Sequence, residues 1–414
     1  MSHIASSPIP GYLLPDTAQV GKDGRLSIGG CDVLELAEEF GTPLFVYDEE
    51  HLRSRCREAM AAFDGRAVYA AKAFLCKAMA ELVDNEQMYL DVATGGELHV
   101  AIAAGFPTSR IFFHGNNKSP DELRQALGAE VGRIVVDNFT ELDNLEALHA
   151  EMGLTEPIPV LIRVTPGIEA HTHEYISTGQ DDSKFGFTVS LGLAEEAMKQ
   201  ATSSDALHLL GVHAHIGSQV FRLDSLARSA ETLAEFVRPL GLAELSVGGG
   251  LGVAYLTGEE APSITEWGEA VREVTQDLGV KVWAEPGRAI VASAAITLYR
   301  VGDIKELPGI RTYVAVDGGM SDNPRPVLYG SGYEAFLPRA TNADRPLQAR
   351  IVGKHCESGD VLVDKAHLPT DLQIGDIIAT PVTGAYGYSM GSNYNKIPRN
   401  PQTCLLYTSP SPRD

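Results

Sequence analysis

The sequence predicts a closed barrel of eight parallel strands, each followed by a helix, together with a second domain built mainly of strands. Two observations carry this prediction. Eight short apolar runs rich in β-forming residues alternate with helix-like segments. Polar or glycine-rich residues stand at the carboxyl end of each run, the rim where such barrels build active sites. The alternative, an open doubly wound sheet, needs a glycine fingerprint in its first strand-helix turn, and the sequence has none there.

The barrel is expected at residues 48–292. Its strands are expected at Ala67–Lys72, Tyr89–Thr94, Ile111–Gly115, Arg133–Asn138, Pro159–Val164, Leu209–Gly217, Glu244–Gly250 and Val280–Arg288. The rim residues are Lys72, Asp91, Thr94, His114, Asp137, Arg163, His215, Gly248 to Gly250, Glu285 and Arg288. A barrel with a purely structural role has no reason to collect such residues at one edge, so this rim is the expected active site.

The second domain is expected to take residues from both sides of the barrel, at 1–47 and 293–403. Its strand candidates are separated by turn residues instead of helices, and they are Arg25–Ile28, Ser293–Val301, Arg311–Val316, Gln348–Val352, Asp360–Val363 and Ile377–Pro381. This pattern is typical of a β-sandwich or barrel-like β domain into which the larger barrel is inserted. The 414 residues and the apolar content of 44% suffice for two such cores.

Charge and cysteine content restrict the functional class. The formal net charge of −22 and the sequence pI of about 4.9 disfavour nucleic acid and anionic membranes as partners. The sequence has no apolar run long enough to span a membrane and no signal-like N-terminus. Its five cysteines lack Cys-x-x-Cys spacing, so we expect neither disulfides nor zinc, and a cytoplasmic location.

The stretch Glu285-Pro286-Gly287-Arg288 follows an apolar strand-like run and indicates cofactor chemistry. A carboxylate at the mouth of a buried strand can pair with a pyridinium nitrogen and keep it protonated. The nearby arginine suits a phosphate dianion. Together they would hold pyridoxal phosphate at both ends, although the same four residues could also form an ordinary turn with a surface ion pair.

Lys72 ends the first expected strand and is the candidate for a covalent bond to that cofactor. Burial there would depress the pKa of its amine and favour the neutral form that makes a Schiff base. A lone lysine at a strand end more often extends its charge into solvent. Its place beside Glu285, on the first and last strands of a closed ring, favours the covalent role.

His213 and His215 lie on the same side of one expected strand, which alone could indicate a metal site. The sequence offers no third ligand with matching spacing, so we expect no metal. We expect His215 to stack on the cofactor ring, while Ser218 and the backbone amides of Gly248 to Gly250 contact phosphate. A tight turn would explain the three glycines equally well.

Motifs along nearly the whole chain resemble those of one family. They are YAAKA at 69–73, LDVATGGEL at 90–98, HGNNKS at 114–119, HTHEYISTGQDDSKFGF at 171–187, HAHIGSQ at 213–219, GGGLG at 248–252, AEPGR at 284–288, CESGD at 356–360 and GAYG at 384–387. On these residues the sequence resembles the pyridoxal-phosphate decarboxylases with an alanine-racemase-type barrel, and most closely the diaminopimelate decarboxylases of bacterial lysine synthesis. Thr94 stands where serine is expected, which keeps the hydroxyl group.

The resemblance implies three sets of site residues. The catalytic set is Lys72, His215, Glu285 and Cys356. The cofactor-binding set is Lys72, Asp91, His215, Ser218, Gly249, Gly250, Glu285, Pro286, Gly287, Arg288 and Tyr386. The substrate-binding set is Arg288, Arg325, Tyr329, Glu357 and Tyr386.

Within these sets, the resemblance implies that Arg325 and Tyr329 meet a substrate carboxylate and Glu357 the distal ammonium group. Cys356 would return a proton to the α-carbon. Taken alone, Arg325 could be a surface arginine after a proline turn, and Cys356 a small buried apolar residue.

The activity implied by the resemblance is decarboxylation of meso-2,6-diaminopimelate to L-lysine and carbon dioxide, with pyridoxal phosphate as cofactor. Glutamate at the ring nitrogen favours a decarboxylase, because racemases of this fold place an arginine there. Three alternatives stay open: another decarboxylase of the same fold, acting on ornithine, arginine or carboxynorspermidine; an inactive homologue that binds a protein partner; and a cofactor-carrying barrel with a homeostatic role.

The resemblance also implies a homodimer in which Cys356 and Glu357 reach the cofactor of the opposite subunit. The C-terminus departs from the family. Residues 404–414 can be back-translated to an adapter used in shotgun library preparation, so we expect a non-native tail and the loss of the last strands of the β domain. A genuine polar tail is the alternative.

Overall fold

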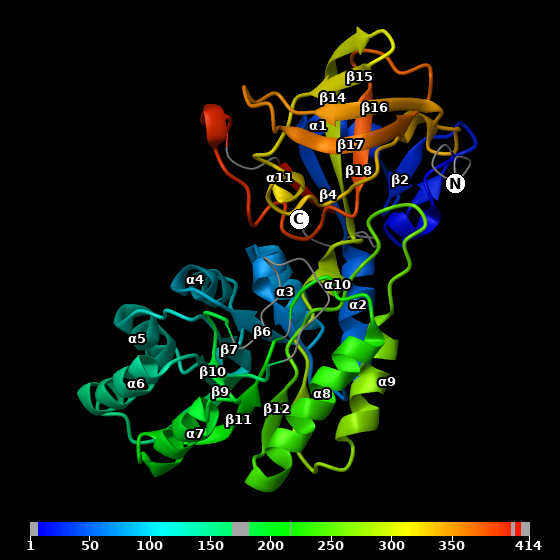
Figure 1. The fold of residues 1–414 in the computed structure, drawn as a ribbon. Coiled ribbons are helices and arrows are strands. Elements are labelled where there is room, and N and C mark those ends of the chain that lie inside the picture. The colour runs from blue at the N-terminus through cyan, green and yellow to red at the C-terminus, as the bar shows by residue number, and fades with distance from the viewer. Residues whose placement is uncertain (1–6, 168–181, 216, 399–401, 407–414) are drawn as a thin grey trace. The chain divides into compact units, whose positions relative to one another are not determined.

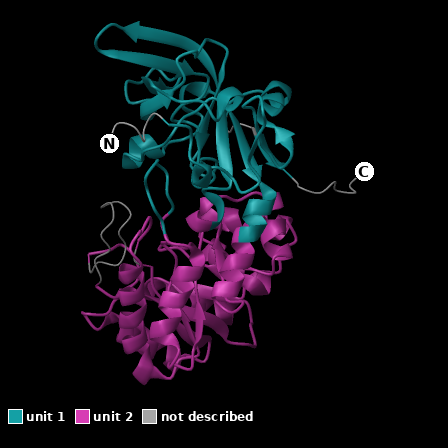
Figure 2. Cartoon of the chain, turned by 90° about the vertical axis from the view of Figure 1, so that its right-hand side faces the viewer, with its two compact units in different colours: residues 1–54, 253–261, 290–414 teal, residues 55–252, 262–289 magenta. Residues whose placement is uncertain are grey.

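The structure, a computed structural model, describes residues 7–167, 182–215, 217–398 and 402–406. The chain divides into two compact units (Figure 2). The barrel unit comprises Arg55–Gly252 and Pro262–Ala289, and the β unit comprises Met1–Ser54, Val253–Ala261 and Ile290–Asp414. The short segment Val253–Ala261 therefore interrupts the barrel sequence and belongs to the β unit, a crossing that the sequence did not indicate.

Eight parallel strands close into a barrel, so the predicted fold class is confirmed. In order around the barrel they are β5 (Val68–Ala70), β6 (Tyr89–Val92), β7 (Ile111–Phe113), β8 (Arg133–Val136), β9 (Ile158–Thr165), β11 (Leu207–His213), β12 (Glu244–Ser246) and β13 (Lys281–Trp283). A parallel bridge between Ala67 and Ala284 closes the ring, and the Val68 N–H donates to the Ala284 carbonyl at 2.8 Å. The short strand β10 (Phe187–Thr188) pairs with β9 in addition.

One helix precedes the eight barrel strands and the others follow them, mostly on the outside of the barrel (Figure 1). They are α2 (Glu49–Ala62), α3 (Lys77–Asn85), α4 (Gly95–Ala103), α5 (Pro120–Gly128), α6 (Phe139–Glu151), α7 (Leu193–Ser203), α8 (Leu223–Val237), α9 (Ile264–Thr275) and α10 (Arg288–Val291). Side-chain caps explain where several begin, because Thr94, Ser119, Asn138 and Ser263 each accept a backbone N–H of the first turn. The Thr94 hydroxyl, expected at the rim, thus serves as the cap of α4.

The amino-terminal end of the barrel is closed by side chains. Val68, Phe112, Val135, Leu161 and Trp283 form a buried cluster. Arg133 and Glu244 begin β8 and β12 and pair through two hydrogen bonds of 2.7 Å. The Arg133 guanidinium also lies 4.9 Å from the Trp283 ring centre. Because side chains fill this end of the barrel, the carboxyl-terminal end is the place where an active site can form.

The β unit contains a sheet assembled from both ends of the chain. Its strands run in the order β17 (Val361–Leu368), β16 (Leu347–Val352), β15 (Arg311–Val316), β14 (Ala295–Leu307), β4 (Leu44–Asp48) and β19 (Gln402–Leu406), and β18 (Ile377–Pro381) pairs with β14. A smaller sheet joins β1 (Gln19–Val20), β2 (Leu26–Ile28) and β3 (Cys31–Asp32). Helices α1 (Val33–Phe40) and α11 (Arg325–Tyr329) lie wholly within this unit. A mostly β domain drawn from both sides of the barrel is therefore present, as predicted.

Parts of three sequence features lie outside the described residues. These are positions 171–181 of the motif at 171–187, position 216 of the motif at 213–219, and positions 407–414 of the expected tail. The described part of that tail, 404–406, belongs to β19, which pairs in parallel with β4. No described helix is both long and apolar enough to cross a membrane.

Gly211 of β11 lies opposite Glu244 of β12, where the two backbones approach closely. A Cβ atom at this position would lie 1.8 Å from the Glu244 carbonyl oxygen. We expect Gly211→Ala to lower the free energy of unfolding by about 1–3 kcal/mol, measured by urea unfolding. Gly128→Ala in α5 is the matched control, because a Cβ there meets nothing within 4 Å. An unchanged unfolding midpoint for Gly211→Ala would contradict the tight pairing of β11 and β12.

Candidate active site

The polar residues predicted at the rim come together at the carboxyl-terminal ends of the barrel strands. Most of their side chains are buried although they are ionisable, namely Asp91, His114, Asp137, Arg163, Glu285 and Arg288. Burying so many ionisable groups is costly unless each finds a partner. The contacts that they make therefore define the site.

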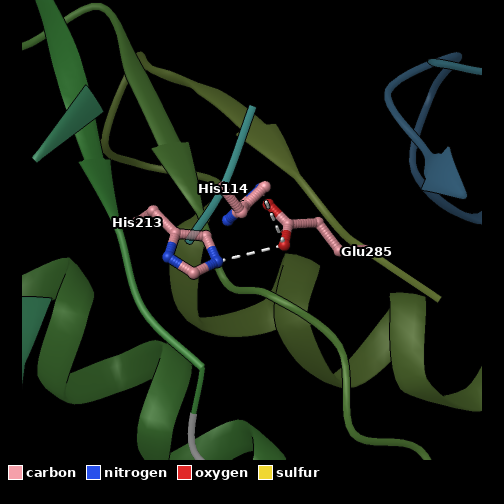
Figure 3. A group of neighbouring side chains, drawn as sticks. All are labelled: His114, His213 and Glu285. Atoms are coloured by element: carbon pink, nitrogen blue, oxygen red, sulfur yellow. Dashed lines mark hydrogen bonds and ion pairs between the residues drawn. The ribbon is translucent and has the colours of Figure 1, made fainter. Parts of the chain in front are cut away.

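Glu285, directly after β13, is the centre of the tightest group (Figure 3). His213 Nε2 donates to Glu285 Oε2 at 3.0 Å, and the Ser246 hydroxyl donates to Oε1 at 2.6 Å. His114 Nε2 lies 3.6 Å from the same Oε2 and 3.8 Å from Asp91 Oδ1. These side chains stand at the ends of separate strands, so only the closed barrel brings them together.

Electrostatics shift the pKa values of two carboxyl groups of this site in opposite directions. Burial alone would raise the pKa of Glu285, but interactions with His213 and His114 and the hydrogen bonds from His213 and Ser246 outweigh burial and hold that pKa below its usual range. Burial and the neighbouring Glu285 charge raise the pKa of Asp91 well above its usual range. Burial also lowers the pKa of His114. At neutral pH, Glu285 is ionised and His114 favours its neutral form.

His114, His213 and Glu285 offer three ligand atoms within 4.8 Å of one another. This group of three could not be predicted from the sequence, because its members are far apart in the chain. Only His213 belongs to the pair, His213 and His215, that could indicate a metal site. Both Glu285 oxygens already accept hydrogen bonds from protein donors. We therefore interpret the trio as a support for the carboxylate, and the expectation of no metal stays a prediction.

His215 and the glycine turn after β12 contact each other. The Gly249 N–H donates to His215 Nδ1 at 3.2 Å, which places the ring proton of neutral His215 on Nε2. Burial lowers the pKa of His215 well below its usual value. The Gly248 N–H donates to the Ser246 hydroxyl at 3.2 Å. Two of the amides expected to meet phosphate thus have partners inside the barrel unit, and their role toward phosphate stays a prediction.

Glycine is required in this turn for steric reasons. A Cβ atom at Gly248 would lie 2.3 Å from the Ala214 carbonyl oxygen, and one at Gly249 would lie 2.2 Å from the Glu285 carbonyl oxygen. Gly248 also has a positive φ of 69°. Close approach of three strand ends therefore explains the triplet. The neighbouring strand β11 ends at His213, so the expected extension of this strand to Gly217 is wrong.

Arg288 and Ser218, both expected near phosphate, contact each other. Arg288 Nη2 donates to Ser218 Oγ at 2.9 Å, and Arg288 is buried at the start of α10. Pro286 and Gly287 connect the last strand to the first. The Ala70 N–H donates to the Pro286 carbonyl at 3.1 Å, and a Cβ at Gly287 would lie 2.9 Å from the Ala70 Cβ.

Lys72 lies in the short 3-10 helix η2 (Ala71–Ala73) after β5, and its side chain is exposed. The expected burial of this side chain is therefore wrong, because the strand ends at Ala70 and Lys72 lies in the helical turn that follows. Its charge still acts on the rim. After burial, Lys72 is the strongest influence that lowers the pKa of His215, and it opposes the rise in the pKa of Asp91.

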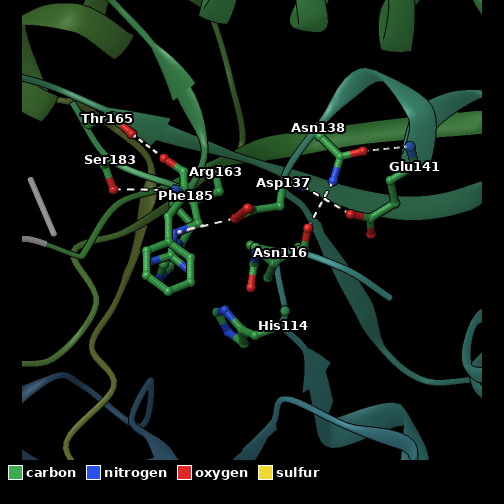
Figure 4. A network of polar contacts seen from close by, with 12 residues as sticks. His114, Asn116, Asp137, Asn138, Glu141, Arg163, Thr165, Ser183 and Phe185 are labelled. Carbon is green, nitrogen blue, oxygen red and sulfur yellow. Dashed lines mark hydrogen bonds and ion pairs between the residues drawn. The ribbon is translucent and has the colours of Figure 1, made fainter. Parts of the chain in front are cut away.

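A second polar network lies at the rim (Figure 4), and two of its members, Lys118 and Glu141, were not predicted from the sequence. Buried Lys118 Nζ lies 2.8 Å from Glu141 Oε1 and donates to two backbone carbonyls at 2.7 and 2.8 Å. Glu141 also accepts the Asp137 N–H at 3.1 Å. Arg163 Nε lies 3.7 Å from Asp137 Oδ1, and its guanidinium lies 4.3 Å from the Phe185 ring centre. The available signal was Lys118 in the HGNNKS motif, but its burial cannot be read from that motif.

In the β unit, Arg325 is buried at the start of α11. Its Nη1 donates to the Tyr333 hydroxyl at 2.5 Å, and its guanidinium lies 4.6 Å from the Tyr255 ring centre. Tyr255 comes from the segment Val253–Ala261 that crosses into this unit. No described carboxylate forms an ion pair with Arg325, so a buried cation is held by neutral groups. The alternative of a surface arginine is wrong.

The other residues implied by the resemblance also lie in the β unit. Cys356 and Glu357 are exposed in the loop between β16 and β17, so the alternative of a small buried cysteine is wrong. The Cys356 N–H donates to Asn395 Oδ1 at 3.3 Å. Tyr329, the last residue of α11, and Tyr386 are half-buried. The roles of these residues toward substrate stay predictions.

Comparison with known proteins gives the class first. A family model described as "Pyridoxal-dependent decarboxylase, pyridoxal binding domain" matches residues 49–292. The chain belongs to the pyridoxal-dependent decarboxylases.

Within this class, the chain is similar to diaminopimelate decarboxylases. That of Bacillus subtilis (strain 168) is 46% identical over 408 residues, which cover 93% of this chain and 91% of that protein. That of Mycobacterium tuberculosis (strain H37Rv) is 45% identical over 399 residues, which cover 91% and 89%. A crystal structure of diaminopimelate decarboxylase from M. jannaschii in co-complex with L-lysine has a TM-score of 0.85 at 32% identity, covering 92% of this chain and 91% of that chain.

The residues of the barrel unit fit pyridoxal phosphate, the cofactor of this family. A buried carboxylate that is ionised at neutral pH suits a protonated ring nitrogen. Buried Arg288, hydrogen-bonded to Ser218, suits a phosphate group. The exposed Lys72 amine, whose charge acts on Asp91 and His215, is available at the same rim.

We expect Glu285→Gln to lower turnover at least about 100-fold while the cofactor stays bound, because the neutral amide cannot hold the ring nitrogen in its protonated form. Turnover is measured by carbon dioxide release and bound cofactor by absorbance. Glu269→Gln on the exposed face of α9 is the control for a lost carboxylate. Turnover of Glu285→Gln equal to the control would mean that Glu285 does not face the ring nitrogen.

Proposed function

We propose that this protein decarboxylates meso-2,6-diaminopimelate to L-lysine and carbon dioxide, the last step of bacterial lysine synthesis. The observation that carries the proposal is the identity, at nearly half of all aligned positions along almost the whole chain, with diaminopimelate decarboxylases. The ionised Glu285 carboxylate and the buried Arg325 guanidinium support it in chemical terms.

Bound pyridoxal phosphate supplies a ring that accepts the electron pair left behind when carbon dioxide departs. In this proposal the barrel residues bind and orient the cofactor. Lys72 would hold the cofactor through its amine. Glu285 would keep a proton on the ring nitrogen, Arg288 and Ser218 would bind the phosphate, and His215 would pack on the ring as a neutral imidazole.

The residues of the β unit select the substrate in this proposal. Arg325 has a planar guanidinium that suits a carboxylate, and it has no described acidic partner that would compete. Tyr329 supports that contact, Glu357 receives the distal ammonium group, and the exposed Cys356 thiol returns a proton to the α-carbon. Ornithine, arginine and carboxynorspermidine lack the distal pair of carboxylate and amine, so this set of groups disfavours them.

The proposal includes a cytoplasmic homodimer with shared active sites, in which Cys356 and Glu357 serve the cofactor of the opposite subunit.

Carbon dioxide release from meso-diaminopimelate, L-lysine, ornithine and arginine, measured side by side, tests the proposed substrate. We expect turnover of diaminopimelate alone, and none by Lys72→Ala, which cannot hold the cofactor covalently. Arg325→Ala should raise the Michaelis constant for diaminopimelate by about 100-fold or more, since the substrate carboxylate is then left unpaired. Preferred turnover of ornithine or arginine by the unmodified protein would refute the proposed substrate.

Mixed dimers test the shared site. Lys72→Ala and Cys356→Ala subunits, mixed equally and allowed to exchange, give about half mixed dimers by random pairing, each with one intact site and one doubly altered site. We expect activity to recover to about a quarter of the unmodified level, although each parent is nearly inactive. If both residues serve the same subunit's site, every site carries an alteration. No recovery after demonstrated exchange would then refute the in-trans arrangement.

A further inference from the structure

We propose that Ser246 and His213 are positioning residues that hold the Glu285 carboxylate, and that Ser246 also ties this carboxylate to the glycine turn at Gly248. The inference rests on the proposed function in one respect, namely that Glu285 faces the ring nitrogen of the cofactor. No sequence pattern indicated this role for Ser246, or for His213, whose spacing from His215 alone could indicate a metal site.

A closed ring of hydrogen bonds links Ser246, Gly248 and Glu285. The Ser246 hydroxyl accepts the Gly248 N–H at 3.2 Å and donates its own proton to Glu285 Oε1 at 2.6 Å. The Glu285 N–H donates to the Gly248 carbonyl at 2.7 Å. An ionised carboxylate only accepts hydrogen bonds, so the direction of each bond in the ring is fixed. Ser246 is fully buried, and water therefore does not compete for its proton.

His213 holds the other carboxylate oxygen. Its Nε2 lies 3.0 Å from Glu285 Oε2 and must carry the proton, because the oxygen is an acceptor. His213 Nδ1 is buried and has no hydrogen-bond partner among the described residues. Among the described residues, the hydrogen bond to Glu285 is therefore the one that holds the His213 ring through its nitrogen atoms. The His114 ring packs edge-on against His213, with ring centres 4.8 Å apart, and fixes its plane.

These contacts leave the carboxylate able to bind one more donor. Each carboxylate oxygen can accept about two hydrogen bonds, and each Glu285 oxygen accepts one from the protein. Donors on a carboxylate stabilise its charged form and make it a weaker base. A proton shared between Glu285 and the ring nitrogen then stays on the nitrogen. Removing either donor should move that proton toward Glu285.

Three variants and one control test the proposal in the full-length protein loaded with cofactor whose ring nitrogen is 15N. Ser246→Ala and His213→Leu each remove a donor, whereas His213→Gln places an amide N–H near the former Nε2. Ser229→Ala removes a buried serine hydroxyl from α8, away from the rim. The first readout is the 15N chemical shift of the ring nitrogen at neutral pH, and the second is the split of kinetic effects between kcat and KM.

We expect the 15N shift to move from the pyridinium value toward the neutral pyridine value in Ser246→Ala and His213→Leu. The kcat should fall about 10-fold or more with KM little changed, because the lost interaction acts on the transition state. His213→Gln should recover most of both effects, and Ser229→Ala should show neither. An unchanged 15N shift in Ser246→Ala and in His213→Leu would overturn the proposal, and either variant alone suffices if the other does not fold.

A double-mutant cycle shows whether Ser246 acts through Glu285. In a Glu285→Gln background, Ser246→Ala should reduce kcat by less than about twofold, since the group that it positions is gone. An equally large reduction in both backgrounds would overturn the proposal. These failures differ from failure of the proposed function, in which the unmodified protein itself would give no pyridinium signal.

Discussion

A buried carboxylate that must stay ionised constrains the rest of the barrel unit. Glu285 is almost completely removed from water, and an isolated carboxylate in that position would take up a proton. Interactions with His213 and His114, together with the hydrogen bonds from His213 and Ser246, prevent this, whereas burial and the Glu285 charge raise the pKa of Asp91. The rim therefore shifts the pKa values of two neighbouring carboxyl groups in opposite directions. Environments that separate the pKa values of paired titratable groups are typical of acid-base sites.

The donors can reach Glu285 only because the backbones at the strand ends lie unusually close together. The Gly248 and Gly249 positions would bring a Cβ to within 2.3 and 2.2 Å of carbonyl oxygens. At the barrel seam, Gly287 packs on Ala70, which is itself bonded to Pro286. The glycines thus serve the carboxylate by letting strands β12, β13 and β5 converge. Residues assigned to the cofactor by resemblance also have this packing role.

The strand count and the rim could be predicted because both follow from local patterns: apolar runs mark strands, and parallel strands present their carboxyl ends at one edge. The ends of the strands could not be predicted, because the apolar run Ala67–Lys72 gives no sign that β5 stops at Ala70. The exposure of Lys72 depends on where this strand ends. Contacts across the closed ring, such as His213 with Glu285, depend on barrel geometry. The burial of Arg325 depends on Tyr255, which reaches the β unit through a crossing of the chain that has no local signature.

The two units hold their key charges in the same physical way. No described lysine or arginine forms an ion pair with Glu285, whose hydrogen-bond donors are a serine and a histidine. Arg325 likewise has tyrosine partners and no described carboxylate partner. A protein counter-charge would occupy the position that a ligand charge needs, and the ligand would then have to displace it. Neutral donors and aromatic faces stabilise a buried charge without cancelling it. In the proposed reaction, a ring nitrogen would therefore match the Glu285 charge and a substrate carboxylate would match the Arg325 charge.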